Sequence, residues 1–346
     1  MKVLVARTDR LGDVVLSLPV FAWLRENRPD WELQAIVAPA SVPLVENDPA
    51  VARVWTWTEG GAVALAPGLA AERFEAAILL WYDAPLARLL RRIGVRRRVG
   101  PLSKWSSWLL LRGGVRQARS RGRRHERDFN LLLAEKLAGR GGPWAEPVLH
   151  LSAEQSAAGR RFRAEAGSPA TLAFVHPGSG GSAVPWPAER FAAVARRLAE
   201  RDGWRVFVTG GPADRAAVDR VLAAAGPRVG DLAGRYDLRG LLGVLSGGDL
   251  LVAPSTGPLH IAAALGLAVA APYSPVPTQS VARWGARGPF VRAASPDVPC
   301  PARLACWGER CRWWNCMERI EADTLVAGAL AAVAAREAAR DGGGEA

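Results

Sequence analysis

The sequence predicts an α/β protein built from two doubly wound, Rossmann-like domains that face each other across a cleft. Two observations support this prediction: one series of strand–turn–helix–strand units starts at the N-terminus, and a second series starts near residue 172. Such units force neighbouring strands to run parallel, with right-handed crossovers. At 346 residues the chain is also long enough for two domains with separate cores.

Short apolar runs bounded by polar, Gly or Pro turns predict the buried strands of the first half. They cover residues 3–6, 33–37 and 76–81, the last running from Ala76 to Trp81. An amphipathic stretch from Val14 to Glu26 predicts one helix, which Pro29 ends. The Gly- and Pro-containing segment 141–150 is expected to connect the domains, so residues 1–150 form the predicted N-terminal domain.

The second half opens with a helix predicted at 153–166 and then alternates strands with helices. The strands are expected at 172–175, 205–209, 250–253 and 268–271, the last of these ending the sheet. The helices are expected at 187–200, 212–225, 238–245, from the turn at 255–260 to residue 265, and at 322–340. Residues 151–325 form the predicted C-terminal domain, and residues 326–346 hold the rest of the final helix and a disordered tail, GGGEA.

The composition is that of a globular protein, with 49% hydrophobic and 23% charged residues. No apolar run reaches the roughly 20 residues that a membrane-spanning helix needs. The apolar start of the chain meets Asp9 and Arg10 too soon to form the core of a signal peptide. We therefore expect a soluble, cytoplasmic protein.

The net charge of +12 is concentrated in one segment, residues 91–127. This segment holds thirteen Lys or Arg residues and one acid, Glu126, so the rest of the chain is close to neutral. The excess of cations suits an anionic membrane surface or a phosphorylated glycolipid, and Trp105 and Trp108 lie inside the segment, as in an interfacial element. The plainer interpretation is a solvated, arginine-rich face. No nucleic-acid partner is expected, because no recognition motif accompanies the charge.

All four cysteines fall late in the chain, at Cys300, Cys306, Cys311 and Cys316. Their spacings, with five, four and four intervening residues, include no C-x-x-C pair and are poor for a zinc knuckle. In a cytoplasmic chain this pattern favours reduced loop thiols, or one local disulfide, over a metal site.

Three Gly-containing turns connect strands to helices in the second half: HPGSGG at 176–181, TGGP at 209–212 and STGP at 255–258. Ligands of open α/β sheets bind beyond the carboxyl ends of the strands, where helix N–H groups and the helix dipole favour phosphate. The turns therefore predict a nucleotide-diphosphate site with candidate residues Ser179, Gly180, Ser255, Thr256 and Gly257. All three turns also fit ordinary tight βα turns, and TGGP fits that interpretation best. The missing P-loop argues against a kinase or an ATPase, and the first turn, RTDRLGD, lacks the G-x-G-x-x-G pattern of an NAD enzyme.

Asp13 is the candidate catalytic acid of the first half. It follows Gly12 at the start of a helix, where an aspartate is most often a cap. From there its side chain would also project into the cleft, where a carboxylate can take a proton from an attacking hydroxyl. His260, beside the third turn, either donates to a phosphate or ribose or caps its helix, whereas His176, at the end of a strand, is expected to be packed.

Four segments carry a resemblance to a known family. They are RTDRLGDVVLSLPVFAWLR at 7–25, HERDFNLLL at 125–133, HPGSGG with Trp186-Pro187 at 176–187, and STGPLHIAAALG at 255–266. Together they resemble glycosyltransferase family 9, the ADP-heptose:lipopolysaccharide heptosyltransferases. The stretch that ends at Cys316 and Met317, followed by Ile320, is also similar to one found in many members.

The resemblance implies a GT-B fold with an acceptor-binding N-terminal domain, a donor-binding C-terminal domain, and metal-independent inverting transfer. It makes Asp13 the general base and places the donor at Ser179-Gly180 and Thr256-Gly257, with His260 nearby. The implied donor is a nucleotide-diphosphate sugar such as ADP-heptose, with no further cofactor and no metal. The implied acceptor is a lipopolysaccharide-like or other cell-envelope glycan, so the protein is expected in the cytoplasm or peripheral on the inner face of the membrane.

The chain departs from the family pattern at two positions. The family usually has a lysine two residues before Trp186-Pro187 and an aspartate before the third Thr/Ser-Gly, whereas this chain has Val184 and Ser255. Arg10 or Arg190 would be the residues that replace the missing positive charge. These departures leave two hypotheses: an active glycosyltransferase, or a catalytically degenerate nucleotide-sugar-binding protein of the same fold.

Overall fold

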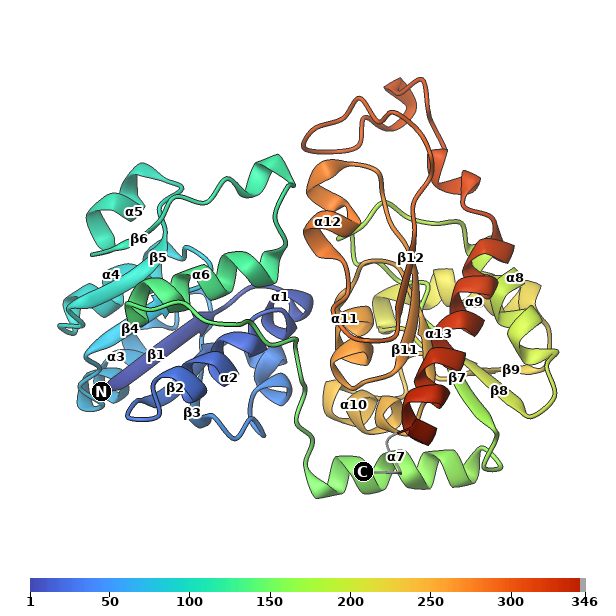
Figure 1. Ribbon diagram of the computed structural model, residues 1–346, viewed down its shortest axis with the longest axis horizontal. Helices are drawn as coiled ribbons and strands as arrows, with labels where there is room; N and C mark the ends of the chain where they lie inside the picture. Colours follow the sequence, from blue (N-terminus) through green and yellow to red (C-terminus); the bar gives the residue numbers. More distant parts are fainter. Residues whose placement is uncertain (343–346) are drawn as a thin grey trace. The chain divides into compact units, whose positions relative to one another are not determined.

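The computed structural model describes residues 1–342 and divides into two compact units, each with its own six-stranded sheet (Figure 1). The first unit comprises Met1–Arg119 and Arg124–His150, and the second comprises Ser120–Arg123 and the chain from Leu151 onward. All strand pairs in both sheets are parallel. The predicted α/β class with two parallel, doubly wound sheets is therefore confirmed.

The sheet of the first unit has the order β3-β2-β1-β4-β5-β6. Its strands are β1 Lys2–Arg7, β2 Glu32–Val37, β3 Val51–Thr56, β4 Ala76–Leu79, β5 Arg97–Pro101 and β6 Gly114–Val115. The helices are α1 Leu11–Val15, α2 Leu18–Asn27, α3 Ala62–Ala71, α4 Ala84–Arg92, α5 Trp105–Leu110 and α6 Glu126–Ala138, with the 3₁₀ turn η1 Pro39–Leu44. The 3₁₀ turn η2 Arg119–Arg121 lies where the chain passes from the first unit into Ser120–Arg123 of the second. The central strand β1 pairs with β2 on one side and β4 on the other, so the winding reverses there, at a point where open sheets bind ligands.

The sheet of the second unit has the order β12-β11-β10-β7-β8-β9, and its winding reverses between β7 and β10. Its strands are β7 Thr171–Val175, β8 Trp204–Val208, β9 Val229–Asp231, β10 Leu250–Val252, β11 Ala268–Pro272 and β12 Val291–Ala294. The helices are α7 Ala153–Glu165, α8 Ala188–Ala199, α9 Arg215–Ala225, α10 Leu238–Ser246, α11 Gly257–Ala264, α12 Val281–Trp284 and α13 Ala322–Gly342. The 3₁₀ turns are η3 Pro212–Asp214, η4 Pro277–Gln279, η5 Gly308–Arg310 and η6 Cys316–Arg319.

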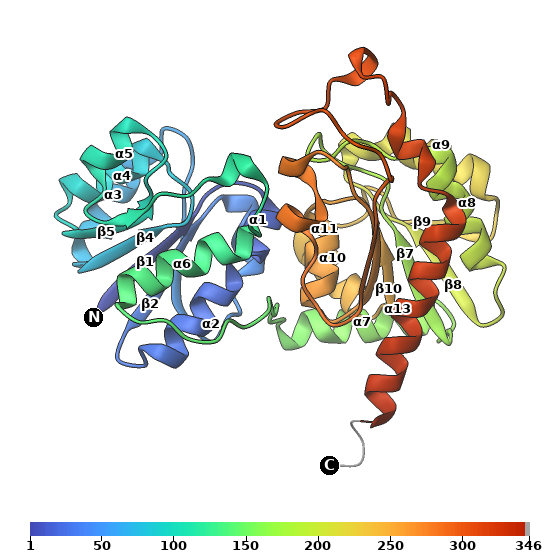
Figure 2. The same cartoon turned by 45° about the horizontal axis from the view of Figure 1, so that its top comes forward.

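The last helix belongs to the packing of the second unit. Figures 1 and 2 show α13 lying along the sheet beside α8, and it contacts β11 and β12. Of the predicted disordered tail, Gly342 is the last residue of α13, and residues 343–346 lie outside the described residues. Among residues 1–342, no helix has both the length and the apolar character needed to cross a membrane.

The prediction of one helix from Val14 to Glu26 is wrong, because the helix is interrupted between α1 and α2. Ser17 lies at the break, and the side-chain amide of Asn130 on α6 donates to its hydroxyl at 3.2 Å and to the carbonyl of Leu16 at 3.1 Å. Pro19 in the first turn of α2 needs no backbone donor there. The side chain of Asn130, distant in the sequence, therefore gives hydrogen bonds to the polar groups at the interruption between α1 and α2.

The predicted strands are all present, but their ends and number differ. The strand predicted to reach Trp81 ends at Leu79, and residues 268–271 do not form the last strand of the second sheet, because β12 follows. The sequence analysis also missed β3, β5, β6 and β9. Four of the missed strands, β3, β6, β9 and β12, lie at sheet edges, where a strand is covered on fewer sides and its sequence is less apolar.

One buried carboxylate ties the first and last helices of the second unit to its sheet. Asp249 accepts from the backbone N–H of Leu172 at 2.9 Å, and from Arg163 of α7 and Arg336 of α13 at 2.7 Å each. Burial alone would raise the pKa of this carboxyl, but its hydrogen bonds and the neighbouring guanidinium groups outweigh burial and lower the pKa. Asp249 is therefore an ionised anchor shared by α7, β7 and α13.

Asp249→Asn should lower the free energy of unfolding by about 3–5 kcal/mol, because the substitution leaves two partly buried guanidinium groups without their counter-charge. Arg340→Gln is the matched control: Arg340 is 60% exposed and approaches the same carboxylate only to 3.5 Å, so its loss should cost less than about 1 kcal/mol. Urea unfolding of the full-length protein, followed by circular dichroism, measures both. Equal small losses would contradict the anchoring role.

Candidate active site

A buried arginine organises the candidate site of the first unit. Arg7 is the last residue of β1 and is 3% exposed. Its guanidinium donates to both carboxylate oxygens of Asp9, at 2.6 and 2.9 Å, and to Glu126 at 2.8 Å. It also donates to Oδ1 of Asp13, in the first turn of α1. One cation thus gathers three carboxylates at the carboxyl end of the central strand.

The charges in this cluster are mutually compensated. Burial by itself lowers the pKa of Arg7, but the three carboxylates together raise it above its ordinary value, so the guanidinium stays charged. Glu126 is fully buried and also accepts from Arg119 at 2.6 Å. The hydroxyl of Ser17 donates to the backbone carbonyl of Asp13 at 2.7 Å. Arg7 therefore holds the Asp13 carboxylate, while Ser17 contacts the backbone of the same residue.

Asp13 was a predicted site residue, whereas Arg7 and Glu126 were not. The two segments that carry these residues, at 7–25 and 125–133, lie far apart in the chain, and the structure brings them together. Two signals were present: a charged residue closes an otherwise apolar strand, and Glu126 is the one acid among the thirteen cations of residues 91–127. Arg7 and Glu126 are both buried, and a buried charge is costly unless an opposite charge pairs with it.

The candidate site of the second unit lies at the carboxyl ends of β7 and β10, which are neighbours in the sheet. Ser182, in the loop after β7, donates to the carbonyl of Ser179 at 2.6 Å and to the carbonyl of Ser255 at 3.4 Å. Gly180 and Gly181 have positive φ angles of 49° and 70°, so the loop turns back on itself in a conformation that favours glycine. The first and third predicted turns are therefore in contact.

Helix α11 presents a helix N-terminus at this place. Thr256 is its N-cap residue, but the Thr256 hydroxyl donates to the carbonyl of Pro254 at 3.2 Å, and within residues 1–342 no side chain caps the helix. Gly257 is the first helical residue, and Pro258 follows it, where its missing N–H is tolerated. An anion at this helix end would meet backbone N–H groups and the positive end of the helix dipole.

His260 lies one turn into α11 and is 4% exposed. Burial lowers its pKa to about 4, so the imidazole is neutral near pH 7. Its Nδ1 atom is buried and has no hydrogen-bond partner among the described residues. His260 can therefore offer one hydrogen bond to a ligand, but not a positive charge.

Ser255 belongs to a network that the sequence did not suggest. Its side chain makes a hydrogen bond to the hydroxyl of Tyr273, which also accepts from the backbone N–H of Ala286 at 2.9 Å. Burial raises the pKa of Tyr273 to about 12, although these two hydrogen bonds lower it in part. The side chain of Ser255 is thus directed toward the neutral hydroxyl of Tyr273, whose position is fixed by its hydrogen bond from Ala286.

The TGGP turn has a structural task. His176 Nδ1 lies 3.1 Å from the hydroxyl of Thr209, and its Nε2 lies 3.9 Å from Asp214 of η3. Burial lowers the pKa of His176 to about 4, against the opposing effect of Asp214, and the prediction of a packed histidine is confirmed. A Cβ atom at Gly178 would lie 2.3 Å from the Asp214 carboxylate, so a larger residue at this position would displace that side chain.

The two arginines suggested as replacement cations are placed differently. Arg10 is the exposed N-cap residue of α1 in the first unit. Arg190, on α8, pairs with the carboxylate of Glu321 and donates to the carbonyl of Glu318 at 3.2 Å. The charge of Arg190 is therefore already engaged by a carboxylate.

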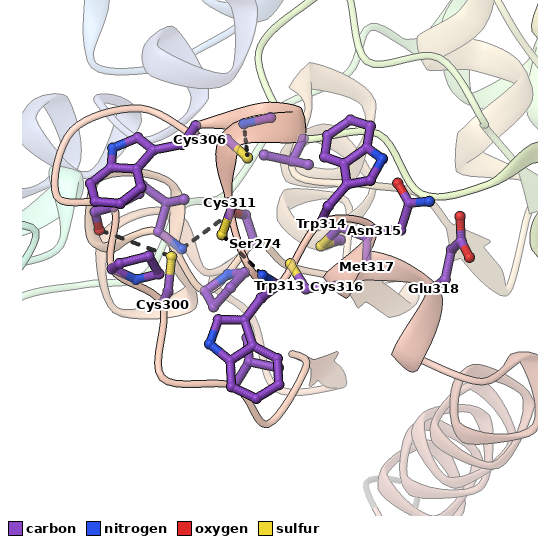
Figure 3. Close-up of a pocket in the computed structure, with 18 of the residues that line it drawn as sticks. Ser274, Cys300, Cys306, Cys311, Trp313, Trp314, Asn315, Cys316, Met317 and Glu318 are labelled. Atoms are coloured by element: carbon purple, nitrogen blue, oxygen red, sulfur yellow. Dashed lines mark hydrogen bonds between the residues drawn. The ribbon is translucent and has the colours of Figure 1, made fainter.

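A cavity of about 310 Å³ in the second unit is lined by all four cysteines, by Val184, and by Trp307, Trp313 and Trp314 (Figure 3). The cysteines are free thiols, and burial together with the three neighbouring thiols raises the pKa of Cys316. Among residues 1–342, no group of three or more His, Cys, Asp or Glu side chains is arranged to hold a metal ion. Val184 also packs against the core of the unit.

Comparisons with known proteins agree on one family. The model of "Glycosyltransferase family 9 (heptosyltransferase)" matches residues 62–306. Two proteins of Haemophilus influenzae are similar: a putative glycosyltransferase, 28% identical over 82% of this chain and 85% of its own length, and the lipopolysaccharide core heptosyltransferase OpsX, 25% identical over 78% of each. The structure of E. coli ADP-heptose lps heptosyltransferase II superposes with a TM-score of 0.80 at 19% identity, over 97% of this chain and all of that one, which shows the shared GT-B fold.

The buried, neutral state of His260 predicts a pH dependence of stability. Unfolded histidine binds a proton near pH 6.5, whereas folded His260 does so only near pH 4. The free energy of unfolding therefore has its full value, as far as His260 is concerned, above pH 6.5. It should fall by about 1.4 kcal/mol per pH unit as the pH drops toward 4, because only the unfolded histidine then binds a proton.

His260→Gln should remove this contribution from the slope of unfolding free energy against pH, measured by urea titration between pH 7 and 4.5. His150→Gln, which changes an exposed histidine in the first unit, is the matched control and should keep the wild-type slope. An unchanged slope in His260→Gln would show that the folded histidine titrates normally.

Proposed function

Because the chain belongs to glycosyltransferase family 9, we propose that it transfers heptose, or a closely related sugar, from a nucleotide-diphosphate sugar to a lipopolysaccharide-like or other cell-envelope glycan. The observation that carries the proposal is the Asp13 carboxylate, held by Arg7 at the carboxyl end of the central strand of the first sheet. The second unit would bind the donor and the first unit would supply the base. The reaction would take place in the cytoplasm, at the inner face of the membrane that carries the acceptor.

The proposed donor site is the pair of turns after β7 and β10. Ser179 and Gly180 lie in the first turn, and Thr256 and Gly257 begin α11, whose uncapped N-terminus suits a diphosphate. His260 would give one neutral hydrogen bond to a phosphate or ribose oxygen. ADP-heptose is the donor we propose, since the similar E. coli structure bears the name of an ADP-heptose transferase.

The proposed reaction is a single displacement. Asp13 takes the proton of the acceptor hydroxyl while that oxygen attacks the anomeric carbon of the donor sugar. The bond between the anomeric carbon and the diphosphate oxygen breaks, and the nucleoside diphosphate leaves with the bonding electron pair. Attack opposite the leaving group inverts the anomeric configuration. The backbone N–H groups at the start of α11 would stabilise the charge on the leaving diphosphate, so this scheme calls for no metal.

The role of Asp13 is tested by Asp13→Asn, which should lower kcat by about 10²- to 10⁴-fold, because an amide cannot accept the proton. The dissociation constant for ADP-heptose, measured by calorimetry, should stay within about twofold of wild type. Asp9→Asn is the matched control, since Asp9 also pairs with Arg7 but lies on the turn before α1; its kcat should change by less than about tenfold. An Asp13→Asn variant as active as wild type on a genuine acceptor would refute the mechanism.

A degenerate binding protein is the second candidate, and Val184 and Ser255 favour it, since Val184 is part of an apolar wall and Ser255 bonds to Tyr273. The two candidates differ in one measurement on wild-type protein. Tight calorimetric binding of ADP-heptose without sugar transfer, across a broad panel of acceptors, would support the binding protein and exclude the transferase.

A further inference from the structure

Helix α5 exposes large apolar side chains on one face. Trp105 is 78%, Trp108 60% and Leu109 63% exposed, and these positions are spaced i, i+3 and i+4. Residues at this spacing lie together on a helix surface. The opposite side, with Ser107 and Leu110, is buried. A surface helix normally shows solvent its polar face and buries its apolar face, so α5 is oriented in the reverse sense.

The helix that carries these side chains is firmly anchored. Arg98 of β5 is buried and its Nε donates to the carbonyl of Leu110, at the end of α5, at 2.7 Å. At the start of α5, the hydroxyl of Ser107 donates to the carbonyl of Lys104 at 2.5 Å. The Tyr82 hydroxyl donates to Ser106 at 2.8 Å. The two indoles and Leu109 are therefore presented by a fixed element of the first unit.

Positive charge surrounds this apolar face. Between Asp83 and Glu126 the sequence contains no acidic residue, and Lys104, Arg91 and Arg112 are exposed. Helix α4, which ends at Arg92, packs against α5. The charges of Arg91 and Arg112 add to burial in lowering the pKa of Arg98, so both cations lie near the residue that anchors the end of α5. The patch therefore combines exposed indoles with exposed cations from a stretch of sequence that contains no acid.

We infer that the exposed face of α5 docks on an anionic phospholipid bilayer, with Trp105, Trp108 and Leu109 entering the interfacial layer and the flanking cations contacting lipid phosphates. Indoles favour the boundary between headgroups and acyl chains, and each cation near such a surface adds to binding. Stacking on nucleic-acid bases would use the indoles but gives Leu109 no part, so a bilayer accounts for the whole face. The inference rests on the proposed function for the choice of a membrane, although docking itself requires neither donor nor acceptor.

The first test is sedimentation of the full-length protein with vesicles. Vesicles of phosphatidylcholine with about a third phosphatidylglycerol should bind the protein on the order of tenfold more tightly than pure phosphatidylcholine, and salt should weaken that binding. Trp105→Ser/Trp108→Ser should reduce binding to the anionic vesicles on the order of tenfold. Trp307→Ser/Trp314→Ser, which removes two exposed tryptophans of the second unit, is the matched control and should bind like wild type.

A charge series separates the two contributions. Arg91→Gln/Arg112→Gln should weaken binding to anionic vesicles and reduce its salt dependence, whereas Arg160→Gln/Arg161→Gln, on exposed positions of α7, should not. Thermal unfolding checks that every variant folds. Brominated lipids should quench wild-type tryptophan fluorescence more than that of Trp105→Ser/Trp108→Ser, because the two indoles would lie at the depth of the bromine atoms.

Three outcomes would overturn the inference. The first is equal vesicle binding by wild type and Trp105→Ser/Trp108→Ser, and the second is tighter binding of wild type to an oligonucleotide than to anionic vesicles. The third is analytical ultracentrifugation in which every other variant is a dimer like wild type and Trp105→Ser/Trp108→Ser is a monomer. Sugar transfer to a lipid-free acceptor reports on the proposed function separately. Transfer that persists without vesicle binding would remove the docking inference alone, and vesicle binding without transfer would remove the proposed function alone.

Discussion

The first unit is arranged around a buried guanidinium. A charge at the position of Arg7, 3% exposed at the end of the central strand, is tolerable only if carboxylates surround it. The chain meets this requirement with Asp9 from the turn after β1, with Asp13 from the first turn of α1 and with Glu126 from the start of α6. Helix α6 also carries Asn130, whose side chain donates a hydrogen bond to the Leu16 carbonyl between α1 and α2. The position of the proposed base is thus a consequence of neutralising one arginine.

The second unit offers a different kind of site, since two of its candidate residues bring no free positive charge to the turns. His260 is neutral because it is buried, and Arg190 is paired with Glu321. What remains at the carboxyl ends of β7 and β10 is the start of α11 and a loop shaped by Gly180 and Gly181. Recognition of a diphosphate there would depend on backbone dipoles, which need no lysine in place of Val184.

The sequence predicted the central strands because their signals are local, whereas the proposed role of Asp13 rested mainly on the family resemblance. Runs such as Val3 to Ala6 are apolar throughout, since a central parallel strand is covered on both faces. Edge strands such as β9 and β12 are short and partly exposed, so their composition does not distinguish them from loops. The contact of Arg7 with Glu126 spans 119 positions, and the break after α1 depends on Asn130. Neither could be predicted without knowing which distant segments meet.

The anchoring of α13 through Asp249 affects the order in which the two units can fold during synthesis. The first unit comprises no residue beyond His150, whereas the buried carboxylate of the second unit is paired with Arg336 as well as with Arg163. At about 5–20 residues per second, the ribosome takes about 10–40 s to add the residues from 151 to 336. The unit with the proposed base can therefore mature during translation, before Arg336 is available to the unit with the proposed donor site.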